Sequence, residues 1–546
     1  MKSHQGRSVV LTKERINEMN AVGAWDDKIL IDHFDEWVKT EPDRTAIISY
    51  FSERDEKISV SFAELSQLSK SIAANFTRLG IGLGDIVSFQ LNNRWEFYAI
   101  SLACVRVGAV TNPLMPVLRE KELSYMLELS RSRIFIVPKR FKRFDFKAMA
   151  LRLREELPTL EYVFVLDDDD SETGFGCLTG EADFIQPPPP HANEIMQLLF
   201  TSGTTGEPKG SMHTANTLFA NVRQFVERIE LTGDDVVLCP TPLAHQLGYL
   251  FGLLLPVFTG ATVIYQDIWN ADTAADLIEQ DKATVCVGAT PFLADLANLE
   301  KISECDLSRF RLFVSGGAPI PPALVRSAKA KLDAEIIPVW GMTEVLVVTL
   351  VKLGDPEAKI FGTDGVAVDH VAVRIVDDNG NQLPCGREGR LEASGASICV
   401  GYLKRPELYK IADEIWFDTG DLARMDEDGY IRITGRSKDI IIRGGENIPV
   451  IEIENALYRH GNLAQVAIVA MPDPRLGERA CAFVVLKKGK EFSMAEMSRY
   501  LTEQRITKVY YPERLEIVDK MPMTATGKIQ KFELRSRAKN FGFEKQ

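Results

Sequence analysis

The sequence lacks the features of a secreted, disulfide-bonded or membrane-spanning protein. It has eight cysteines in 546 residues and no Cys-x-x-Cys pair, so neither a zinc knuckle nor a redox pair is indicated. The first twenty residues contain no apolar core of a secretory signal. The most apolar stretch, Gly248–Tyr265, is broken by Gly252, Pro256 and Gly260, whereas a membrane span needs roughly 20 continuous apolar residues. We therefore expect a soluble cytoplasmic protein in which this stretch forms a buried helix and then a strand, Ala261–Tyr265.

An excess of positive charge is also absent. The chain has 64 Lys and Arg against 77 Asp and Glu, a net charge of −13, so nucleic acid is not expected as a partner. Hydrophobic residues make up 45% and charged residues 26%, which excludes wholesale disorder. A local cationic site for a small anionic ligand remains compatible with this composition.

The order of apolar segments predicts an α/β fold with more than one domain. Strand-like runs such as Ile86–Leu91 alternate with helical patterns such as Trp95–Val107 through the first two thirds of the chain. After about residue 365 the segments become short and β-like, and past Arg436 the α/β pattern returns. We predict a large N-terminal domain, residues 1–437, with mixed sheets and a small β-barrel-like part. Residues 438–546 are predicted to form a small α+β domain.

The segment between residues 201 and 210 predicts a phosphate-binding loop. It follows the apolar run Ile195–Phe200, and a helical pattern begins at Thr214. Glycines let several backbone N–H groups face one anion, and a following helix would add its N-terminus. Pro208 stands where a Walker A loop needs glycine, so that loop type is disfavoured. An ordinary glycine-rich strand–helix turn is the alternative interpretation. The candidate ligand-binding residues are Thr201, Ser202, Gly203, Thr204, Thr205, Gly206 and Lys209.

This loop, read as SGTTGEPKG, resembles the signature of the adenylate-forming superfamily, which includes acyl-CoA synthetases and peptide-synthetase adenylation domains. Other segments resemble its further signatures in the same order. They are WGMTE at 340–344, DTGD at 418–421, GRSKD at 435–439, GGENI at 444–448 and PMTATGKI at 522–529. Over most of its length the chain looks most similar to medium- or short-chain fatty acyl-CoA synthetases and cyclohexanecarboxylate-CoA ligases.

The resemblance implies two half-reactions with ATP, Mg²⁺ and coenzyme A as cofactors. A carboxylate attacks the α-phosphate of ATP to give acyl-AMP and pyrophosphate, and a thiol then displaces AMP. Lys528 would stabilise the shared negative charge, and Thr343 would donate to the α-phosphate. Glu344, with Thr204, would hold Mg²⁺, which prefers oxygen ligands. The C-terminal domain would be a mobile lid that swings between the two half-reactions.

The resemblance also assigns residues to the nucleotide and to the thiol. Asp421 would accept from the ribose hydroxyls with Arg436 nearby, and Trp340 would stack on adenine, although it departs from the usual tyrosine and loses a phenol hydrogen bond. Core packing is the alternative interpretation of Trp340. Lys438 would be the pivot between the two orientations of the C-terminal domain, and the alternative is an ordinary exposed lysine in a loop. The remaining implied contacts are Gly316, Gly317, Ala318 and Pro319 beside adenine, Gly341 and Met342 beside Trp340, and Gly444 and Gly445 along the thiol channel.

The acid is predicted from the segment that resembles the acyl-pocket motif, Pro240–Gly248. His245 lies where acyl-CoA synthetases often carry a histidine, although a lone histidine is more often structural. No acidic residue occurs from Pro240 to Gln266, so an amino acid would leave its ammonium unpaired. The apolar run Val345–Val348 suggests an apolar lining or, alternatively, core packing. We expect a compact apolar acid.

The thiol and the alternatives complete the prediction. We expect free coenzyme A as the acceptor, because about 18 residues follow Lys528 and no carrier domain is apparent. An enzyme that loads an acid onto a separate carrier protein is one alternative. A non-catalytic nucleotide-binding protein on the same fold is another, although the presence of both Lys528 and Glu344 argues against it. A monomer or a homodimer is expected.

Overall fold

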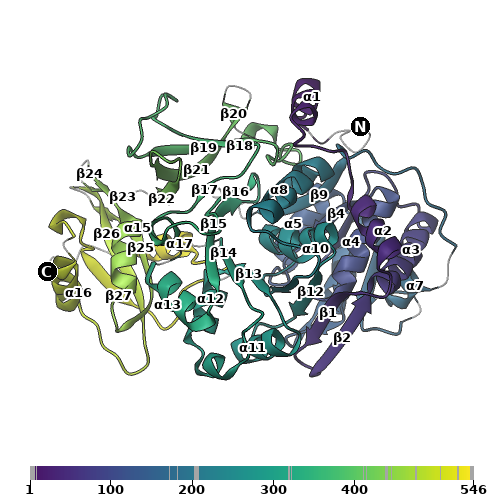
Figure 1. The fold of residues 1–546 in the computed structure, drawn as a ribbon, viewed down its shortest axis with the longest axis horizontal. Helices are drawn as coiled ribbons and strands as arrows, with labels where there is room; N and C mark the ends of the chain where they lie inside the picture. Colours follow the sequence, from purple (N-terminus) through teal and green to yellow (C-terminus); the bar gives the residue numbers. More distant parts are fainter. Residues whose placement is uncertain are drawn as a thin grey trace.

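The computed structural model describes residues 7, 9–170, 172–180, 183–201, 208–317, 320, 322–409, 411–412, 415–436, 441–443, 446–473, 476–504, 506–524 and 528–541. Two large sheets and the helices between and around them form most of the chain, as Figure 1 shows on the right and in the centre. A smaller sheet and a separate C-terminal unit complete it. The fold is therefore α/β, with a large N-terminal domain of several sheets and a small C-terminal domain.

The largest sheet has nine strands with a parallel centre. Strands β15, β14, β13, β11, β12 and β1 run parallel in that order, while β16, β17 and β2 pair antiparallel at the two edges. The strands in spatial order are β17 Val366–Ala367, β16 Leu346–Leu350, β15 Glu335–Met342, β14 Leu312–Gly316, β13 Val285–Ala289, β11 Val236–Cys239, β12 Thr262–Gln266, β1 Thr45–Phe51 and β2 Glu56–Ser61.

The second sheet has six strands, of which only the edge strand β10 is antiparallel. Its strands in spatial order are β10 Lys209–Thr214, β9 Ile195–Thr201, β4 Val110–Pro113, β3 Ile86–Phe89, β5 Ile134–Pro138 and β8 Tyr162–Leu166. Strand β10 differs from the prediction, which placed a helix directly after the phosphate loop. Its backbone pairs on one side with β9 and on the other with residues 400–403. The loop therefore joins two strands of a hairpin, and no helix N-terminus follows it directly.

The helices pack on both sheets and merge them into one apolar core. Helix α4 is buried along nearly its whole length and contacts both β1 and β4, and α8 contacts both β10 and β16. A helix that is apolar on all sides is expected at such a central place. The helices of the N-terminal domain are α1 Lys13–Ala21, α2 Leu30–Thr40, α3 Phe62–Arg78, α4 Trp95–Val107, α5 Glu120–Ser130, α6 Phe146–Glu156, α7 Gly176–Thr179, α8 Ala215–Arg228, α9 Gln246–Gly248, α10 Leu255–Thr259, α11 Ala271–Gln280, α12 Thr290–Asn298, α13 Pro322–Leu332 and α14 Glu357–Gly362.

The apolar stretch at Gly248–Tyr265 folds as predicted in outline, with one difference. A π-helical turn, η2 Tyr249–Leu254, joins α9 to α10, and Gly260 ends α10 in the left-handed region before β12. Single π turns inside helices are frequent at functional sites. Within the described residues, none of the helices combines the length and the apolar character needed to cross a bilayer.

The later part of the chain contains two five-stranded sheets. The first, at the top of Figure 1, is antiparallel and consists of β18 Val371–Val376, β19 Gly389–Gly395, β20 Ile411–Ala412, β21 Trp416–Met425 and β22 Ile431–Arg436. The second forms the unit drawn in yellow-green on the left and has its own apolar core. Its elements are β23 Ile441–Arg443, β24 Glu446–Ile448, α15 Val450–Tyr458, β25 Leu463–Asp473, β26 Gly477–Leu486, α16 Met494–Glu503, β27 Arg514–Ile517 and α17 Lys531–Ala538. The predicted boundary at 437/438 lies outside the described residues and stays a prediction.

The remaining elements are short. They are the hairpin strands β6 Arg140–Phe141 and β7 Phe144–Asp145, and the 3-10 turns η3 Glu300–Glu304, η4 Pro406–Leu408 and η5 Lys508–Tyr510.

All eight cysteines are free thiols; Cys177 and Cys385 are exposed, and the others are wholly or partly buried.

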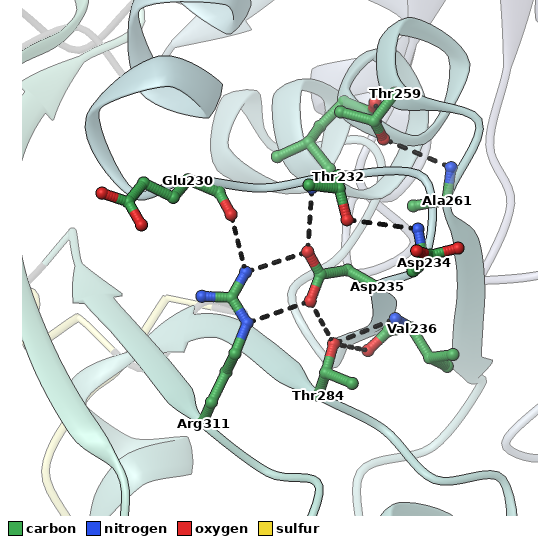
Figure 2. Close-up of polar contacts among 10 residues, drawn as sticks. Glu230, Thr232, Asp234, Asp235, Val236, Thr259, Ala261, Thr284 and Arg311 are labelled. Atoms are coloured by element: carbon green, nitrogen blue, oxygen red, sulfur yellow. Dashed lines mark hydrogen bonds and ion pairs between the residues drawn. The ribbon is translucent and has the colours of Figure 1, made fainter.

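The buried Asp235 and the partly exposed Arg311 form an ion pair at the amino ends of the central strands of the large sheet. Asp235, Thr284 and Arg311 each stand directly before a strand, namely β11, β13 and β14. Arg311 donates to both carboxylate oxygens of Asp235, from Nε at 3.1 Å and from Nη2 at 2.9 Å (Figure 2). The Thr284 hydroxyl and the Thr232 N–H also donate to this carboxylate, at 2.7 and 2.9 Å. Four hydrogen bonds therefore hold Asp235 at the amino edge.

Candidate active site

The predicted site residues gather at the opposite, carboxyl edge of the same sheet. Strand β11 leads into Pro240–His245, β14 ends at Gly316, and β15 carries Trp340, Gly341 and Met342. Ligands of open parallel sheets bind where strands end in this way. Gly316 is required here because a Cβ would overlap the Val339 side chain of β15. Gly317 follows at the surface, and Ala318 and Pro319 lie outside the described residues.

Thr343 and Glu344 lie in the turn of the hairpin formed by β15 and β16. Leu346, directly after this turn, has φ +60°, a conformation that costs free energy for a residue other than glycine. Gly341 pairs with Val347 across the hairpin, and a Cβ at Gly341 would overlap the Leu346 carbonyl oxygen. The turn is therefore tight and strained, and the following residues Val345–Val348 pack in the core. Core packing accounts for the apolar run that the sequence left open.

Three consecutive carbonyls of this turn accept hydrogen bonds from other elements. The His213 Nε2 of β10 donates to Thr343 at 2.8 Å, and the Ser397 hydroxyl donates to Val345 at 2.9 Å. Between them, the Cys399 N–H donates to Glu344 at 2.7 Å. Burial lowers the pKa of His213 to about 4, so the ring is neutral at pH 7 and carries one hydrogen for this bond. These bonds fix the backbone on which Thr343 and Glu344 stand.

The Glu344 carboxylate is buried, with 6% of the residue exposed, yet it has few partners. The Tyr402 hydroxyl donates to Oε1 at 2.6 Å. Within the described part of the chain, no Lys or Arg pairs with Glu344, and Oε2 accepts no hydrogen bond and is not sealed from the surface. A buried carboxylate without a counterion is costly, and an added cation would remove that cost.

This environment fits a divalent cation. Magnesium is usually bound by one or two carboxylates together with substrate phosphates. Among the described residues no group of three or more His, Cys, Asp or Glu could hold a metal by itself. The single open oxygen of Glu344 therefore fits Mg²⁺ that arrives with ATP. Thr204, the other predicted metal-binding residue, lies outside the described residues.

The two ends of the phosphate loop lie side by side. Thr201 at the end of β9 pairs with Lys209 at the start of β10. The Lys209 ammonium lies 5.2 Å from the ring centre of Tyr402. Residues Ser202, Gly203, Thr204, Thr205 and Gly206 lie outside the described residues. The structure thus brings the loop's lysine and Glu344 to the same tyrosine.

Asp421 forms a second buried carboxylate, with 4% of the residue exposed. It pairs across β21 and β22 with Arg436, whose Nε donates to Oδ1 at 2.8 Å. The Trp340 indole donates to Oδ2 at 3.1 Å. Trp340 has no phenol hydroxyl, as expected, but its indole Nε1–H supplies a hydrogen-bond donor to Asp421. Each carboxylate oxygen keeps capacity for a further hydrogen bond, so Asp421 can still accept from two ribose hydroxyls.

His245 follows β11 and caps α9. Its Nδ1 accepts from the Leu247 N–H at 3.3 Å, which leaves the ring hydrogen of the neutral form on Nε2. Burial lowers the pKa of His245 to about 4, and the positive charge of Lys528 adds to this effect. At neutral pH the residue is therefore a neutral donor at Nε2.

Lys528 is exposed and belongs to the C-terminal unit. Its N–H donates to the Thr524 hydroxyl at 3.0 Å, and its carbonyl accepts from the Thr524 N–H at 2.7 Å. The positive charge of Lys528 helps to lower the pKa of His245, so the two residues lie within electrostatic range of each other. Lys438, Gly444 and Gly445 lie outside the described residues, and their roles stay predictions.

Sequence reasoning did not identify Tyr402, His213, Ser397 and Cys399 as supports of the site. His213 and Thr343 are 130 residues apart, and Tyr402 and Glu344 are 58 apart. A tyrosine and a histidine in ordinary strand-like segments carry no local signal for such contacts. Only the pairing of β10 with residues 400–403 reveals them.

Comparison with known proteins places this site in a family. The model of the AMP-binding enzymes matches residues 34–403, and that of their C-terminal domain matches residues 452–528. The chain is 38% identical to the medium-chain fatty-acid–CoA ligase of Escherichia coli K12, covering 94% of this chain and 91% of that protein. It is 30% identical to the 2,3-dihydroxybenzoate-AMP ligase of Bacillus subtilis, covering 87% and 88%.

A solved structure agrees with this placement. ATP-bound MatB from Rhodopseudomonas palustris superposes with a TM-score of 0.83 at 28% identity, covering 94% of this chain and 99% of that one. The chain therefore belongs to the AMP-binding, adenylate-forming superfamily and is an AMP-forming acid–thiol ligase of the acyl-CoA synthetase family.

Proposed function

We propose that the protein joins a compact apolar carboxylic acid to coenzyme A, at the expense of ATP and through an acyl-AMP intermediate. A short- or medium-chain fatty acid or an alicyclic acid such as cyclohexanecarboxylate would be the substrate. The similarity to a medium-chain fatty-acid–CoA ligase supports the acid class. The observation that carries the proposal is the buried apolar segment from α9 through α10, which begins at the capping residue His245.

The apolar segment argues for the kind of acid. Residues from α9 through α10 are buried or nearly so, and no carboxylate occurs between Pro240 and Gln266. An amino-acid substrate would bring an ammonium into this region without a partner, which is costly. An apolar chain or ring instead gains about 25 cal/mol for each Å² of its surface that is buried.

The first half-reaction follows from the charges at the site. One carboxylate oxygen attacks the α-phosphorus, and the bond from that phosphorus to pyrophosphate breaks. Lys528 would lie beside both anions and stabilise the negative charge that they share. Glu344 would hold the Mg²⁺ that accompanies ATP, and that ion would neutralise charge on the departing pyrophosphate. Asp421, held by Trp340 and Arg436, would fix the ribose.

The second half-reaction replaces AMP by a thiol. The sulfur attacks the acyl carbonyl, the bond from carbon to the AMP oxygen breaks, and the thiol proton is released to solvent. His245 would donate from Nε2 to an oxygen of the acid and hold its head group in place. Lys528 would not be required in this step, because the predicted swing of the C-terminal domain would carry it away before the thiol attacks.

A carrier protein is the other candidate acceptor. The chain is also similar to a 2,3-dihydroxybenzoate-AMP ligase, whose name specifies AMP and no coenzyme A, so we keep this alternative. The two proposals share acyl-AMP formation and differ only in the thiol. An assay with free coenzyme A as the sole acceptor distinguishes the two proposals, because only the first one predicts turnover under that condition.

The experiment is AMP release with Mg-ATP and coenzyme A across hexanoate, octanoate, cyclohexanecarboxylate, benzoate, 2,3-dihydroxybenzoate and leucine. We expect turnover that depends on coenzyme A and is highest for an apolar, non-aromatic acid. Acid-dependent pyrophosphate exchange without coenzyme A turnover would favour the carrier-protein alternative. Turnover only with leucine would overturn the proposed acid, and silence in both assays would favour a nucleotide-binding protein without catalysis.

A further inference from the structure

Tyr402 connects two parts of the site that are far apart in sequence. It is buried, with 3% of the residue exposed, and its hydroxyl donates to Glu344 Oε1 at 2.6 Å. Its backbone forms a bridge with Ser211 of β10, and the Lys209 ammonium lies over its ring. The strand that leaves the phosphate loop and the turn that carries Glu344 therefore meet at one side chain.

A second tyrosine in the chain has the same kind of neighbours but a different balance of charge. The Tyr430 hydroxyl donates to both oxygens of Asp355 at 2.8 Å, and the Lys359 ammonium lies 4.4 Å from its ring centre. There Lys359 also pairs with Asp426 and Asp428, each at 2.7 Å. Asp355 also accepts from the Lys352 N–H at 2.7 Å, so both oxygens of this carboxylate accept hydrogen bonds.

Glu344 differs because only one of its oxygens is occupied. The terminal torsion of a free glutamate is broad. The hydrogen bond from Tyr402 to Oε1 restricts this torsion and so orients the plane of the carboxylate. Oε2 accepts no hydrogen bond from a described residue. A phenol is also a neutral donor, so it orients the carboxylate and leaves its charge for a cation. A lysine in its place would neutralise that charge.

We propose that Tyr402 is a positioning residue that presents Glu344 Oε2 to the divalent cation of Mg-ATP and ties this cation site to the strand of the phosphate loop. The inference rests on the proposed function, in which Glu344 meets that cation. Tyr402 itself touches neither the acid nor the nucleotide in this assignment. Its effect should therefore appear only where the metal takes part.

The test is Tyr402→Phe, which keeps the ring and removes only the hydroxyl. Calorimetry without any acid would measure the binding of Mg-ATP and, in EDTA, of metal-free ATP. We expect Mg-ATP to bind about tenfold more weakly, because a hydrogen bond to a charged group is lost, while metal-free ATP changes less than twofold. In the coenzyme A assay, the Mg²⁺ concentration for half-maximal rate should rise, and kcat should return at saturating Mg²⁺.

Tyr430→Phe is the matched control, since it removes a tyrosine-to-carboxylate bond beneath a lysine outside the site. It should change none of these quantities. A double-mutant cycle adds an independent measurement: on a Glu344→Gln background, Tyr402→Phe should cause less than a twofold further loss of Mg-ATP binding.

Three results would overturn the inference. They are unchanged Mg-ATP binding in Tyr402→Phe, an equal loss with and without metal, and full additivity with Glu344→Gln. Failure of the proposed function would look different, because the unaltered protein would then form no acyl-AMP from any acid in the panel. Measurements on the Tyr402→Phe variant therefore test the inference, whereas measurements on the unaltered protein test the proposed function.

Discussion

The two edges of the nine-stranded sheet each carry a buried carboxylate, and their surroundings differ. Asp235 at the amino edge and Glu344 at the carboxyl edge are similarly buried, at 5% and 6% exposed. Asp235 receives four hydrogen bonds, two of them from one guanidinium (Figure 2), whereas the Glu344 carboxylate receives one from a described residue. A buried charge whose partners are all supplied by the chain supports the fold. A buried charge with an open oxygen is prepared for a ligand.

The pKa of Asp235 agrees with this distinction. Burial would raise it, but hydrogen bonds from Arg311, Thr232 and Thr284 hold it below its ordinary value. The amino edge therefore keeps its charge without any ligand. Under the proposed function, the carboxyl edge would be completed by ATP, its cation and Lys528 from the C-terminal unit.

The largest effect should follow from removing the cation that comes from outside the sheet. Lys528→Ala should lower acyl-AMP formation from acid and ATP about a thousandfold, the loss typical of one charge-stabilising group. Thioester formation from supplied acyl-AMP should change less than threefold. Pyrophosphate exchange and single-turnover thioester formation measure the two steps. Lys531→Ala is a control, because Lys531 pairs with Glu454 within the same unit at 2.7 Å. Equal loss in both half-reactions would contradict the role given to Lys528.

Replacing each of the two buried carboxylates, Glu344 and Asp235, by the corresponding amide tests the comparison directly. Glu344→Gln should lower acyl-AMP formation about a hundredfold and leave the unfolding free energy within about 1 kcal/mol. Asp235→Asn should instead lower the stability of the protein and leave its activity unchanged. It removes the partner of Arg311 and should cost about 3 kcal/mol of unfolding free energy, with kcat retained. Urea unfolding and initial rates measure both. Loss of activity in Asp235→Asn at full stability would contradict the division between the two edges.

Most of the scaffold behind this comparison could be predicted from the sequence. Helix Trp95–Val107 has the predicted bounds, and the predicted strand Ile86–Leu91 forms β3, Ile86–Phe89, because their apolar patterns determine burial locally. The order of the motifs also predicted that Trp340, Glu344 and Asp421 would share a site. These residues follow strands or turns whose local sequence is distinctive.

What could not be predicted depends on pairing between distant segments. Strand β10, Lys209–Thr214, is small and polar in sequence and becomes a strand because both of its edges are paired. That pairing brings His213 to Thr343 and places Tyr402 beneath Lys209. The indole bond from Trp340 to Asp421 was missed for the same reason, since it crosses 81 residues. The local pattern indicates which residues matter and does not show how they are held.

Acid should affect the carboxyl edge before the amino edge. His213 supports the Thr343 turn in its neutral form, with a pKa lowered to about 4 by burial. The unfolded chain takes up this proton near pH 6.5. The contribution is therefore full above pH 6.5 and is lost as the pH falls toward 4, by about 2 kcal/mol at pH 5.

Urea unfolding at pH 7, 6, 5 and 4.5 measures this loss. His213→Gln should be less stable at pH 7 and should show a shallower fall with pH. His191→Gln, at an exposed histidine, should leave the slope as it is. A slope unchanged by His213→Gln would show that other groups cause the acid sensitivity. Asp235 and Arg311 should remain paired through this range, because the pKa of Asp235 is lowered.

The smallest expected effect concerns Asp421, whose surroundings are intermediate between those of Asp235 and Glu344. Asp421 has an ion pair, as Asp235 has, and it also keeps capacity for a ligand, as Glu344 does. Trp340→Phe removes one donor and leaves Arg436 in place, so we expect ATP and AMP to bind about fivefold more weakly and the KM of the acid to stay constant. Trp269→Phe is the matched control, because its indole, in the loop after β12, donates to Asp295 of α12 at 2.8 Å and not to Asp421. Calorimetry with AMP gives the affinity without catalysis. A change in the KM of the acid, with AMP binding intact, would place Trp340 on the acyl side and leave Arg436 as the residue that holds Asp421 for the ribose.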